Sequence, residues 1–259
     1  LNKTENTQIS IYAMSMAILK ILESKGIKPV AAAGLSLGEY SALTAAGVIS
    51  LEDGAKIVRT RGKLMQNLAP EGNWAMAAII GLEDNQVEEA CSKVTNGFVK
   101  AVNYNCPGQV VVSGEKDAVV KAMENAKELG AKRVIELKTS GPFHTEKLQA
   151  ASAELKKELE KVNFQTFEIP VIKNYNGEKY TAEDNMVEIL ANHVVNPVKF
   201  GKSIETMLEM GVDTFIEIGP GKTLSGFVKK VCKKLEKEVN VFNIENVETL
   251  ESTLETIEK

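Results

Sequence analysis

Apolar residues recur at helical spacing near the start of the chain. Ile11, Met14, Ile18 and Leu22 are three or four positions apart, which places their side chains on one face of a helix. This pattern predicts a helix over Thr4–Lys25. The face that carries these four residues is expected to pack against the rest of the protein.

The next segment changes from small apolar residues to a helical pattern. The run 30–36 predicts a short buried strand, and 37–46 predicts a helix that follows it at once. A further helix is expected from Leu51, because Ser50 can cap it and because Glu52 and Asp53 suit the positive end of its dipole.

The pattern of predicted strands and helices changes in residues 71–138. Strand and helix patterns follow one another there in the order β-α-β-β-α-β, which is the split βαβ of a ferredoxin-like unit. The predicted elements are strand 75–80, helix 84–94, strand 98–104, strand 109–113, helix 116–129 and strand 133–137. We interpret residues 71–138 as a small subdomain inserted in a larger domain.

Helix and strand patterns also alternate after this insertion. The predicted elements are helix 146–161, strand 167–173, helix 203–210, strand 213–218, helix 223–235, strand 239–244 and a closing helix. Such alternation predicts an α/β core with a mostly parallel sheet. The core domain is expected to comprise residues 1–70 and 139–259, with a native N-terminal segment missing ahead of Leu1.

Composition narrows the class of protein. The 259 residues are 44% hydrophobic and 25% charged, and the formal net charge is −4, which gives nucleic-acid binding no electrostatic support. No apolar stretch is long enough to span a bilayer. The three cysteines, Cys91, Cys106 and Cys232, lie far apart and match neither a disulfide framework nor a zinc site. A cytoplasmic protein without metal or cofactor is therefore expected.

The candidate nucleophile is a serine between a predicted strand and a predicted helix. Gly34-Leu35-Ser36-Leu37-Gly38 has the pattern G-x-S-x-G, in which glycines allow a sharp turn that lifts the serine above a sheet. The helix that follows directs free backbone N–H groups toward the same place, and the Leu37 N–H is the expected oxyanion donor. The alternative is a tight strand-helix turn in which the glycines and the serine only shape the backbone and have no catalytic role.

A serine hydroxyl needs a base, and the chain has two histidines. His144 lies in a turn just before a predicted helix, whereas His193 lies at a helix end. We favour His144 because loops at the ends of elements hold catalytic groups well. The residues alone leave open whether an acidic side chain or a main-chain carbonyl orients this base.

Two arginines lie one helix after the serine. An arginine can bind a carboxylate with two parallel hydrogen bonds, so Arg59 or Arg61 is a candidate for a substrate that carries a free carboxylate. The alternative is that both are exposed helix residues.

Several ordered motifs at matching spacing extend along nearly the whole chain. They are Thr4-x-x-x-Gln8, Gly34 to Leu43, Arg61 to Gln66, Asn103 to Gln109, Gly141-Pro142-Phe143-His144, Asn196-Pro197-Val198 and Glu217 to Lys222. With these motifs the chain resembles the malonyl-CoA:acyl-carrier-protein transacylases of bacterial fatty-acid synthesis. The resemblance implies an α/β-hydrolase-like core with the inserted subdomain.

The resemblance also implies roles for site residues. Ser36 would carry the acyl group, His144 would be the general base and acid, and Arg61 would bind the malonyl carboxylate. The family begins with a Gly-Gln-Gly-x-Gln segment whose last glutamine helps form the oxyanion hole, and no such segment precedes Thr4. Leu35 stands where most members have histidine.

Further positions follow from the same resemblance. The main-chain carbonyl of His193, where many members have glutamine, would orient the base. Asn103, Asn105 and Gln109 would line the cleft, and Phe143 would belong to a loop of the malonyl type. The expected partners are malonyl-CoA and an acyl carrier protein, and the expected oligomeric state is a monomer.

Three other functions share part of this pattern. A serine thioesterase would use the same elbow with water as acceptor, but it would leave Arg61 without a task. An acyltransferase domain cut from a polyketide synthase fits a fragment that starts after the first strand. A catalytically silent module that only binds partners would be identified by a Ser36 that forms no covalent adduct.

Overall fold

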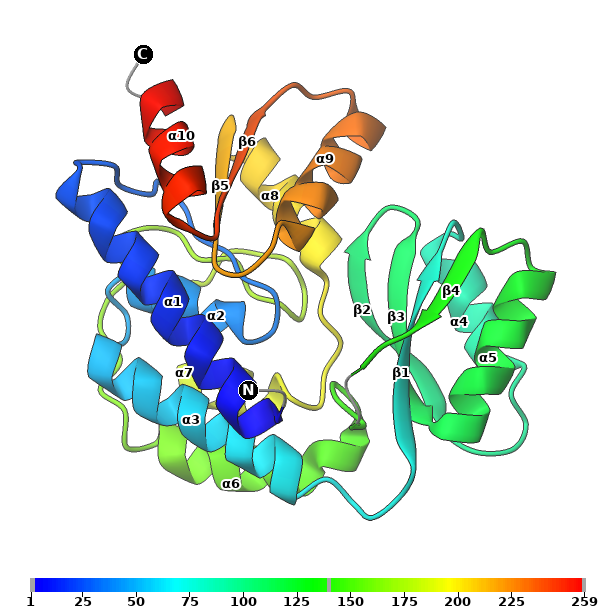
Figure 1. Ribbon diagram of the computed structural model, residues 1–259. Helices are drawn as coiled ribbons and strands as arrows, with labels where there is room; N and C mark the ends of the chain where they lie inside the picture. Colours follow the sequence, from blue (N-terminus) through cyan, green and yellow to red (C-terminus); the bar gives the residue numbers. More distant parts are fainter. Residues whose placement is uncertain (1–2, 139–140, 258–259) are drawn as a thin grey trace.

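The apolar stripe near the start of the chain forms α1 (Thr4–Ser24) in the computed structural model, which describes residues 3–138 and 141–257. Tyr12, Met16 and Leu19 are buried in the main hydrophobic core. α1 packs along α3 (Leu51–Asn67), as Figure 1 shows. The Ser50 hydroxyl caps α3 by accepting the N–H of Asp53 at 3.0 Å, so this predicted cap is confirmed.

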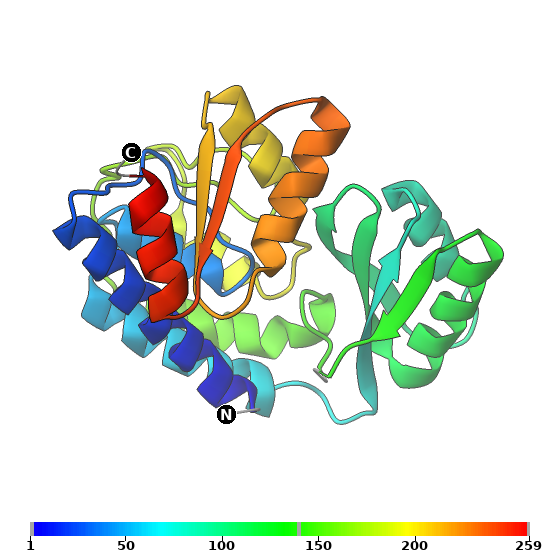
Figure 2. The same ribbon diagram turned by 45° about the horizontal axis from the view of Figure 1, so that its top comes forward.

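The rest of the larger part consists mainly of helices around this core. Its elements are α2 (Gly38–Ala45), the short 3-10 helix η1 (Glu146–Leu148), α6 (Gln149–Leu159), α7 (Met186–Asn192), α8 (Phe200–Glu209), β5 (Thr214–Ile218), α9 (Thr223–Leu235), β6 (Asn240–Ile244) and α10 (Val247–Ile257). β5 and β6 form a parallel pair with α9 and α10 on opposite sides (Figure 2). Among the described residues, no helix is both long enough and apolar enough to cross a membrane.

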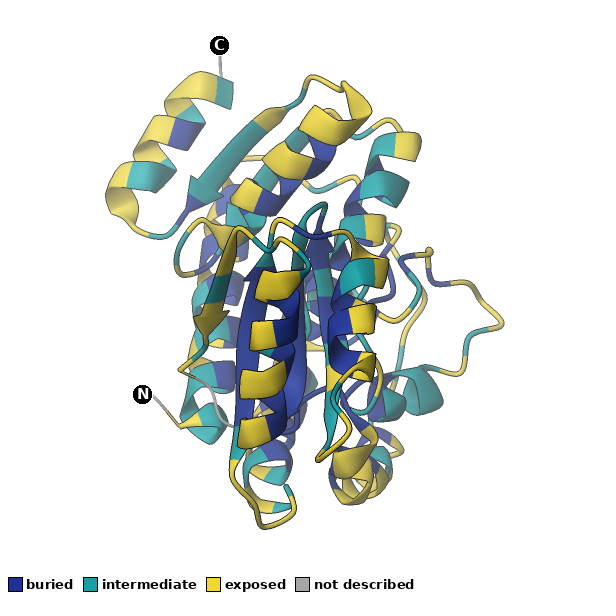
Figure 3. Ribbon diagram, turned by 90° about the vertical axis from the view of Figure 1, so that its right-hand side faces the viewer, coloured by how far each residue is buried: buried dark blue, intermediate teal, exposed yellow. Residues whose placement is uncertain are grey.

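The smaller part has the predicted order of elements. They are β1 (Trp74–Ile80), α4 (Asp84–Ser92), β2 (Val99–Cys106), β3 (Gln109–Glu115), α5 (Lys116–Glu128) and β4 (Arg133–Glu136). The strands form an antiparallel sheet in the order β2-β3-β1-β4, which is the arrangement of a ferredoxin-like unit. α4 and α5 cover it with buried inner faces and exposed outer faces (Figure 3).

The α/β class is as expected, but the mostly parallel sheet is not confirmed. The larger sheet is antiparallel, and the parallel contacts are the β5–β6 pair and isolated bridges such as Ala32–Val171. The predicted strand 30–36 is limited to that bridge because the chain turns sharply from Gly34 onward. The predicted strand 167–173 pairs only at Val171 and Ile172, since Pro170 before them has no N–H to donate.

Backbone hydrogen bonds join the small sheet to the larger part. Tyr104 N donates to the Val198 carbonyl, and Val198 N donates to the Val102 carbonyl, both at 2.8 Å. β2 thereby lies along the segment that contains Asn196. The predicted domain limits at residues 70/71 and 138/139 stay predictions, and residue 139 lies outside the described residues.

Candidate active site

The turn around Ser36 has the geometry that its glycines allow. A Cβ on Gly34 would lie 2.1 Å from the backbone of Gly38, so only glycine fits there. Ser36 has φ 52°, a left-handed conformation that costs a non-glycine residue about 1–3 kcal/mol. α2 begins at Gly38, directly after this turn. The Leu37 N–H therefore belongs to the backbone donors at the helix start that have no acceptor within the helix.

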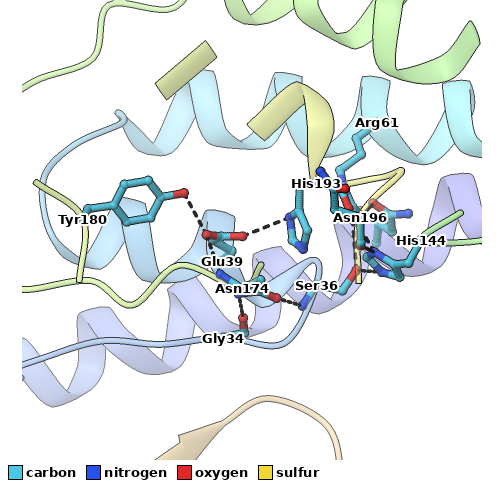
Figure 4. A network of polar contacts seen from close by, with 10 residues as sticks. Gly34, Ser36, Glu39, Arg61, His144, Asn174, Tyr180, His193 and Asn196 are labelled. Carbon is cyan, nitrogen blue, oxygen red and sulfur yellow. Dashed lines mark hydrogen bonds and ion pairs between the residues drawn. The ribbon is translucent and has the colours of Figure 1, made fainter. Parts of the chain in front are cut away.

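His144 contacts the serine from a distant part of the chain. Its Nε2 lies 2.8 Å from Ser36 Oγ, and its Nδ1 lies 3.0 Å from the His193 carbonyl and 3.1 Å from the Asn196 carbonyl. Because carbonyl oxygens only accept, Nδ1 carries the proton and Nε2 is left as the acceptor for the serine hydroxyl. Figure 4 shows this arrangement.

Main-chain contacts hold the histidine in place. His144 has φ 60°, so it occupies the left-handed region like Ser36. The His144 N–H donates to the Val194 carbonyl at 3.0 Å, and the Thr145 hydroxyl donates to the Pro142 carbonyl at 2.6 Å. Two strained residues thus face each other, and such strain concentrates at functional sites.

The two candidate arginines have different surroundings. Arg61 is 1% exposed; its Nη2 donates to Ser36 Oγ at 3.0 Å and its Nη1 donates to Gln8 Oε1 at 2.6 Å. Its guanidinium also lies over the Tyr40 ring, 5.6 Å from the centroid. Arg59 is exposed and donates to Asn6 Oδ1 at 3.3 Å. Only Arg61 is therefore placed to bind an anion beside the serine.

The structure keeps the dyad histidine neutral over a wide pH range. Burial is the main cause that lowers the pKa of His144 to about 3, and electrostatic interactions with His193 and with Arg61 lower it further. Hydrogen bonds to the His193 and Asn196 carbonyls act in the opposite direction. Burial likewise lowers the pKa of Arg61, which nevertheless stays charged near neutrality because arginine starts far above that range.

The reactivity of Ser36 is expected to persist well below pH 6.5. A base must be neutral to accept a proton, so the lowered pKa of His144 moves the acid limb toward pH 3. Rates of Ser36 labelling by a fluorophosphonate are therefore expected to stay nearly level between about pH 4 and 8. Half-maximal labelling near the ordinary histidine pKa, about 6.5, would contradict this expectation. His193→Gln removes the electrostatic contribution of His193 that lowers the pKa of His144, and it is expected to move the limb upward.

The control for that experiment is the folded fraction at each pH. Below about pH 6.5 an unfolded chain binds a proton at His144 that the folded chain does not bind until about pH 3. Stability is therefore expected to fall as the pH decreases through this window. Circular dichroism separates loss of fold from loss of reactivity.

The remaining predicted residues lie on β2, at the start of β3 and next to His144 in the sequence. Asn103 and Asn105 are buried on β2, and Phe143 is buried in the main core next to Gly141. Gln109 accepts a hydrogen bond from Lys230 of α9 at 3.2 Å. Within the described residues, no hydrogen bond joins these side-chain amides to the serine, and their part in the site stays a prediction.

Sequence reasoning assigned no role to four residues that the structure brings to the site. Gln8 binds Arg61, Asn196 shares the Nδ1 proton of His144, and Asn174 and Glu39 lie beneath the serine turn. Gln8, Glu39 and Asn196 belong to motifs recognised in the sequence, so only their contacts were missing. Asn174 follows a poorly formed strand and carried no signal.

Together these contacts describe a hydroxyl that can lose its proton to an imidazole. The neighbouring guanidinium supplies a fixed positive charge, and the start of α2 supplies backbone donors for a developing oxyanion. This combination suits covalent transfer of an acyl group that itself carries a negative charge.

Comparisons with known proteins agree over most of the chain. The family described as acyl transferase domain matches residues 1–252. The malonyl CoA-acyl carrier protein transacylase of Bacillus subtilis (strain 168) is 44% identical over 238 residues, 91% of this chain and 75% of that protein. The crystal structure of the corresponding protein from Clostridium perfringens is 48% identical, with a TM-score of 0.94 over 100% of this chain and 80% of that one.

A further solved structure contains a second protein. It is a type II PKS acyl-carrier protein in complex with its malonyl-transacylase. The similarity to this chain is 38% identity with a TM-score of 0.92, covering 99% of this chain and 82% of that one.

Proposed function

The chain belongs to the acyl transferase domain family, and from this premise we propose that it transfers a malonyl group from malonyl-CoA to the phosphopantetheine thiol of an acyl carrier protein. The product would supply fatty-acid synthesis. The observation that carries the proposal is the buried guanidinium of Arg61, 3.0 Å from Ser36 Oγ. A malonyl group on that oxygen has its free carboxylate only two carbons beyond the ester carbonyl, within reach of this cation.

The first half of the reaction acylates the serine. Ser36 Oγ attacks the thioester carbonyl of malonyl-CoA while its proton passes to Nε2 of His144. The tetrahedral oxyanion accepts a hydrogen bond from the Leu37 N–H. The carbon–sulfur bond then breaks, and the coenzyme A thiolate leaves with the proton from Nε2, so His144 is neutral again.

The second half reverses these steps with another thiol. His144 takes the proton of the phosphopantetheine thiol, whose sulfur attacks the malonyl ester carbonyl. The ester bond breaks, Ser36 Oγ recovers its proton from Nε2, and the malonyl thioester leaves on the carrier. The proposed steps use the dyad, Arg61 and a backbone amide, with both thioester partners as substrates.

The small sheet and the lysines nearby are candidates for contact with the carrier. We propose that Asn103 and Asn105 of β2 line the approach to Ser36, since β2 is bonded to the segment that holds His144. Lys230 and Lys234 of α9 contact Gln109 and Glu83 of the small subdomain. These cations lie where α9 meets the small subdomain, and an acidic carrier would be attracted to them.

The cysteines bear on the cellular compartment. Cys91, Cys106 and Cys232 are buried and unpaired, as is usual in a reducing environment. We propose a cytoplasmic location for the reaction, where both thioester substrates would be available.

Intact-protein mass after brief incubation with malonyl-CoA tests the proposed function. Wild-type protein is expected to gain one malonyl group and to lose it when carrier protein with its phosphopantetheine is added. The Ser36→Ala protein is expected to gain nothing. An adduct that is lost to water as fast as to carrier would favour a thioesterase, and the absence of any adduct would contradict the proposal.

A further inference from the structure

One buried carboxylate lies next to Asn174, which binds the serine turn, and has no part in the proposed chemistry. Glu39 of α2 is 1% exposed. Its Oε1 accepts the Tyr180 hydroxyl at 2.7 Å and the Asn174 backbone N–H at 3.2 Å, and its Oε2 lies 3.0 Å from His193 Nδ1. Figure 4 shows the carboxylate between these groups. Burying a charge is costly, so its surroundings are informative.

The first branch from this carboxylate leads to the nucleophile. Asn174, whose N–H binds Glu39, places its side-chain amide across the serine turn. Its Nδ2 donates to the Gly34 carbonyl at 2.7 Å, and its Oδ1 accepts the Ser36 N–H at 2.7 Å. One amide thus holds both sides of the turn in which Ser36 has φ 52°. Displacing Asn174 would release that strained conformation.

The second branch leads to the base. The side chain of His193 lies against Glu39, and the main-chain carbonyl of His193 accepts the Nδ1 proton of His144. The His193 Nδ1 atom is within ion-pair distance of Oε2, but its N–H is not aligned for a hydrogen bond. The contact is an ion pair when the His193 ring is protonated, and it then depends on the charge of the carboxylate.

Other charged or titratable groups near Glu39 do not replace it in this position. Tyr40 and Arg61 interact with Glu39 electrostatically. Among the described residues, neither of them forms a hydrogen bond with Asn174 or His193. Glu39 contacts both Asn174, which holds the nucleophile, and His193, whose carbonyl orients the base.

We propose that Glu39 is a positioning residue that keeps Ser36 and His144 at their reacting distance. It acts on the serine through Asn174 and on the histidine through His193. The inference rests on the proposed function, because it assigns a role within the same acyl transfer. It predicts that the negative charge of Glu39, and not only its shape, supports the rate of Ser36 acylation.

Glu39→Gln tests this role because glutamine keeps the shape and can still accept the Tyr180 and Asn174 hydrogen bonds. The rate of acylation by malonyl-CoA is expected to fall on the order of 10- to 100-fold, while the KM for malonyl-CoA stays within about threefold because Arg61 keeps its hydrogen bonds to Gln8 and Ser36. An acylation rate within about twofold of wild type would overturn the proposal. A rise in KM at unchanged kcat would overturn it as well.

Asp184→Asn is the matched control for loss of local stability. Asp184 accepts hydrogen bonds from Lys173 Nζ and from the Thr181 N–H, both at 2.8 Å, in the loop that carries Asn174. This variant is expected to lower the melting temperature and to leave the acylation rate of the folded protein unchanged. An equal loss of rate in both variants would show that loop stability alone matters and would overturn the role of Glu39.

A fluorophosphonate separates this proposal from the proposed function. It reacts with an activated serine without an acyl donor or carrier, so its rate also depends on the distance between Ser36 and His144. Wild-type protein that reacts with the fluorophosphonate but not with malonyl-CoA would contradict the proposed function. The labelling rate of Glu39→Gln, divided by that of wild type, would then still test the positioning role. A ratio near one would overturn it.

Discussion

Replacing Ser36 with alanine is expected to lower malonyl transfer by about 10⁵- to 10⁶-fold, the size of loss found when a serine hydrolase loses its nucleophile. The reason is direct: Ser36 Oγ is the atom on which the malonyl group would be carried. Steady-state transfer to carrier protein measures the loss. His144→Ala is expected to lower the rate by a similar factor, because Nε2 lies 2.8 Å from that oxygen and would take its proton in the proposed mechanism.

The two losses are not expected to add. Once the nucleophile or the base is missing, the other has no task, so the Ser36→Ala/His144→Ala protein is expected to be about as slow as either single variant. A double variant that is slower by the product of both factors would contradict the dyad. So would a His144→Ala protein that retains more than about a hundredth of the wild-type rate. Unchanged melting temperatures would show that the fold is intact.

Replacing Arg61 with alanine is expected to remove the preference for malonyl groups. A buried charge that loses its partner costs about 3–5 kcal/mol, and each 1.4 kcal/mol corresponds to about a factor of ten. We therefore expect kcat/KM for malonyl-CoA to fall on the order of 10²- to 10³-fold. For acetyl-CoA it is expected to stay level or to rise, since a neutral acyl group leaves the wild-type guanidinium unpaired. Competition between the two thioesters measures the preference.

Arg59→Ala is the matched control for this experiment. Arg59 lies on the same helix and is exposed. Within the described part of the chain, its side chain forms a hydrogen bond with Asn6 and with no other residue. Its replacement is expected to change kcat/KM for malonyl-CoA and kcat/KM for acetyl-CoA by no more than about twofold. Equal losses for malonyl-CoA and acetyl-CoA in Arg61→Ala would mean that Arg61 supports the serine, to which it donates a hydrogen bond, and does not select the carboxylate.

Elements with a strong local pattern were predictable from the sequence. The helix Thr223–Leu235 has the predicted limits, and the small subdomain has the predicted order of strands and helices. The failures are the strands expected over 30–36 and 167–173, each of which is limited to isolated bridges. A short apolar run fixes only that a segment is buried, whereas the length of a strand also depends on neighbours that the run does not encode.

Some features of the candidate site were likewise predictable from the sequence, and others were not. The serine turn was predictable because its geometry is local: Gly34 stands two residues before Ser36, and a Cβ there would collide with the backbone of Gly38. The choice between His144 and His193 could be argued from position and from the family resemblance. The contacts of Asn174 and Glu39 could not be predicted, because they join residues more than 130 positions apart.

By itself, the sequence determined the serine turn, the helices with periodic apolar faces and the family to which the chain belongs. The family resemblance pointed to Arg61 and to the His193 carbonyl, whereas only the tertiary structure decided that the Asn196 carbonyl also accepts the proton of His144 and that Gln8 binds Arg61. It also placed one carboxylate between the nucleophile and the base. The physical reason is that backbone preferences act over a few residues, whereas burial, pKa and hydrogen-bond partners depend on segments that meet only when the chain is folded.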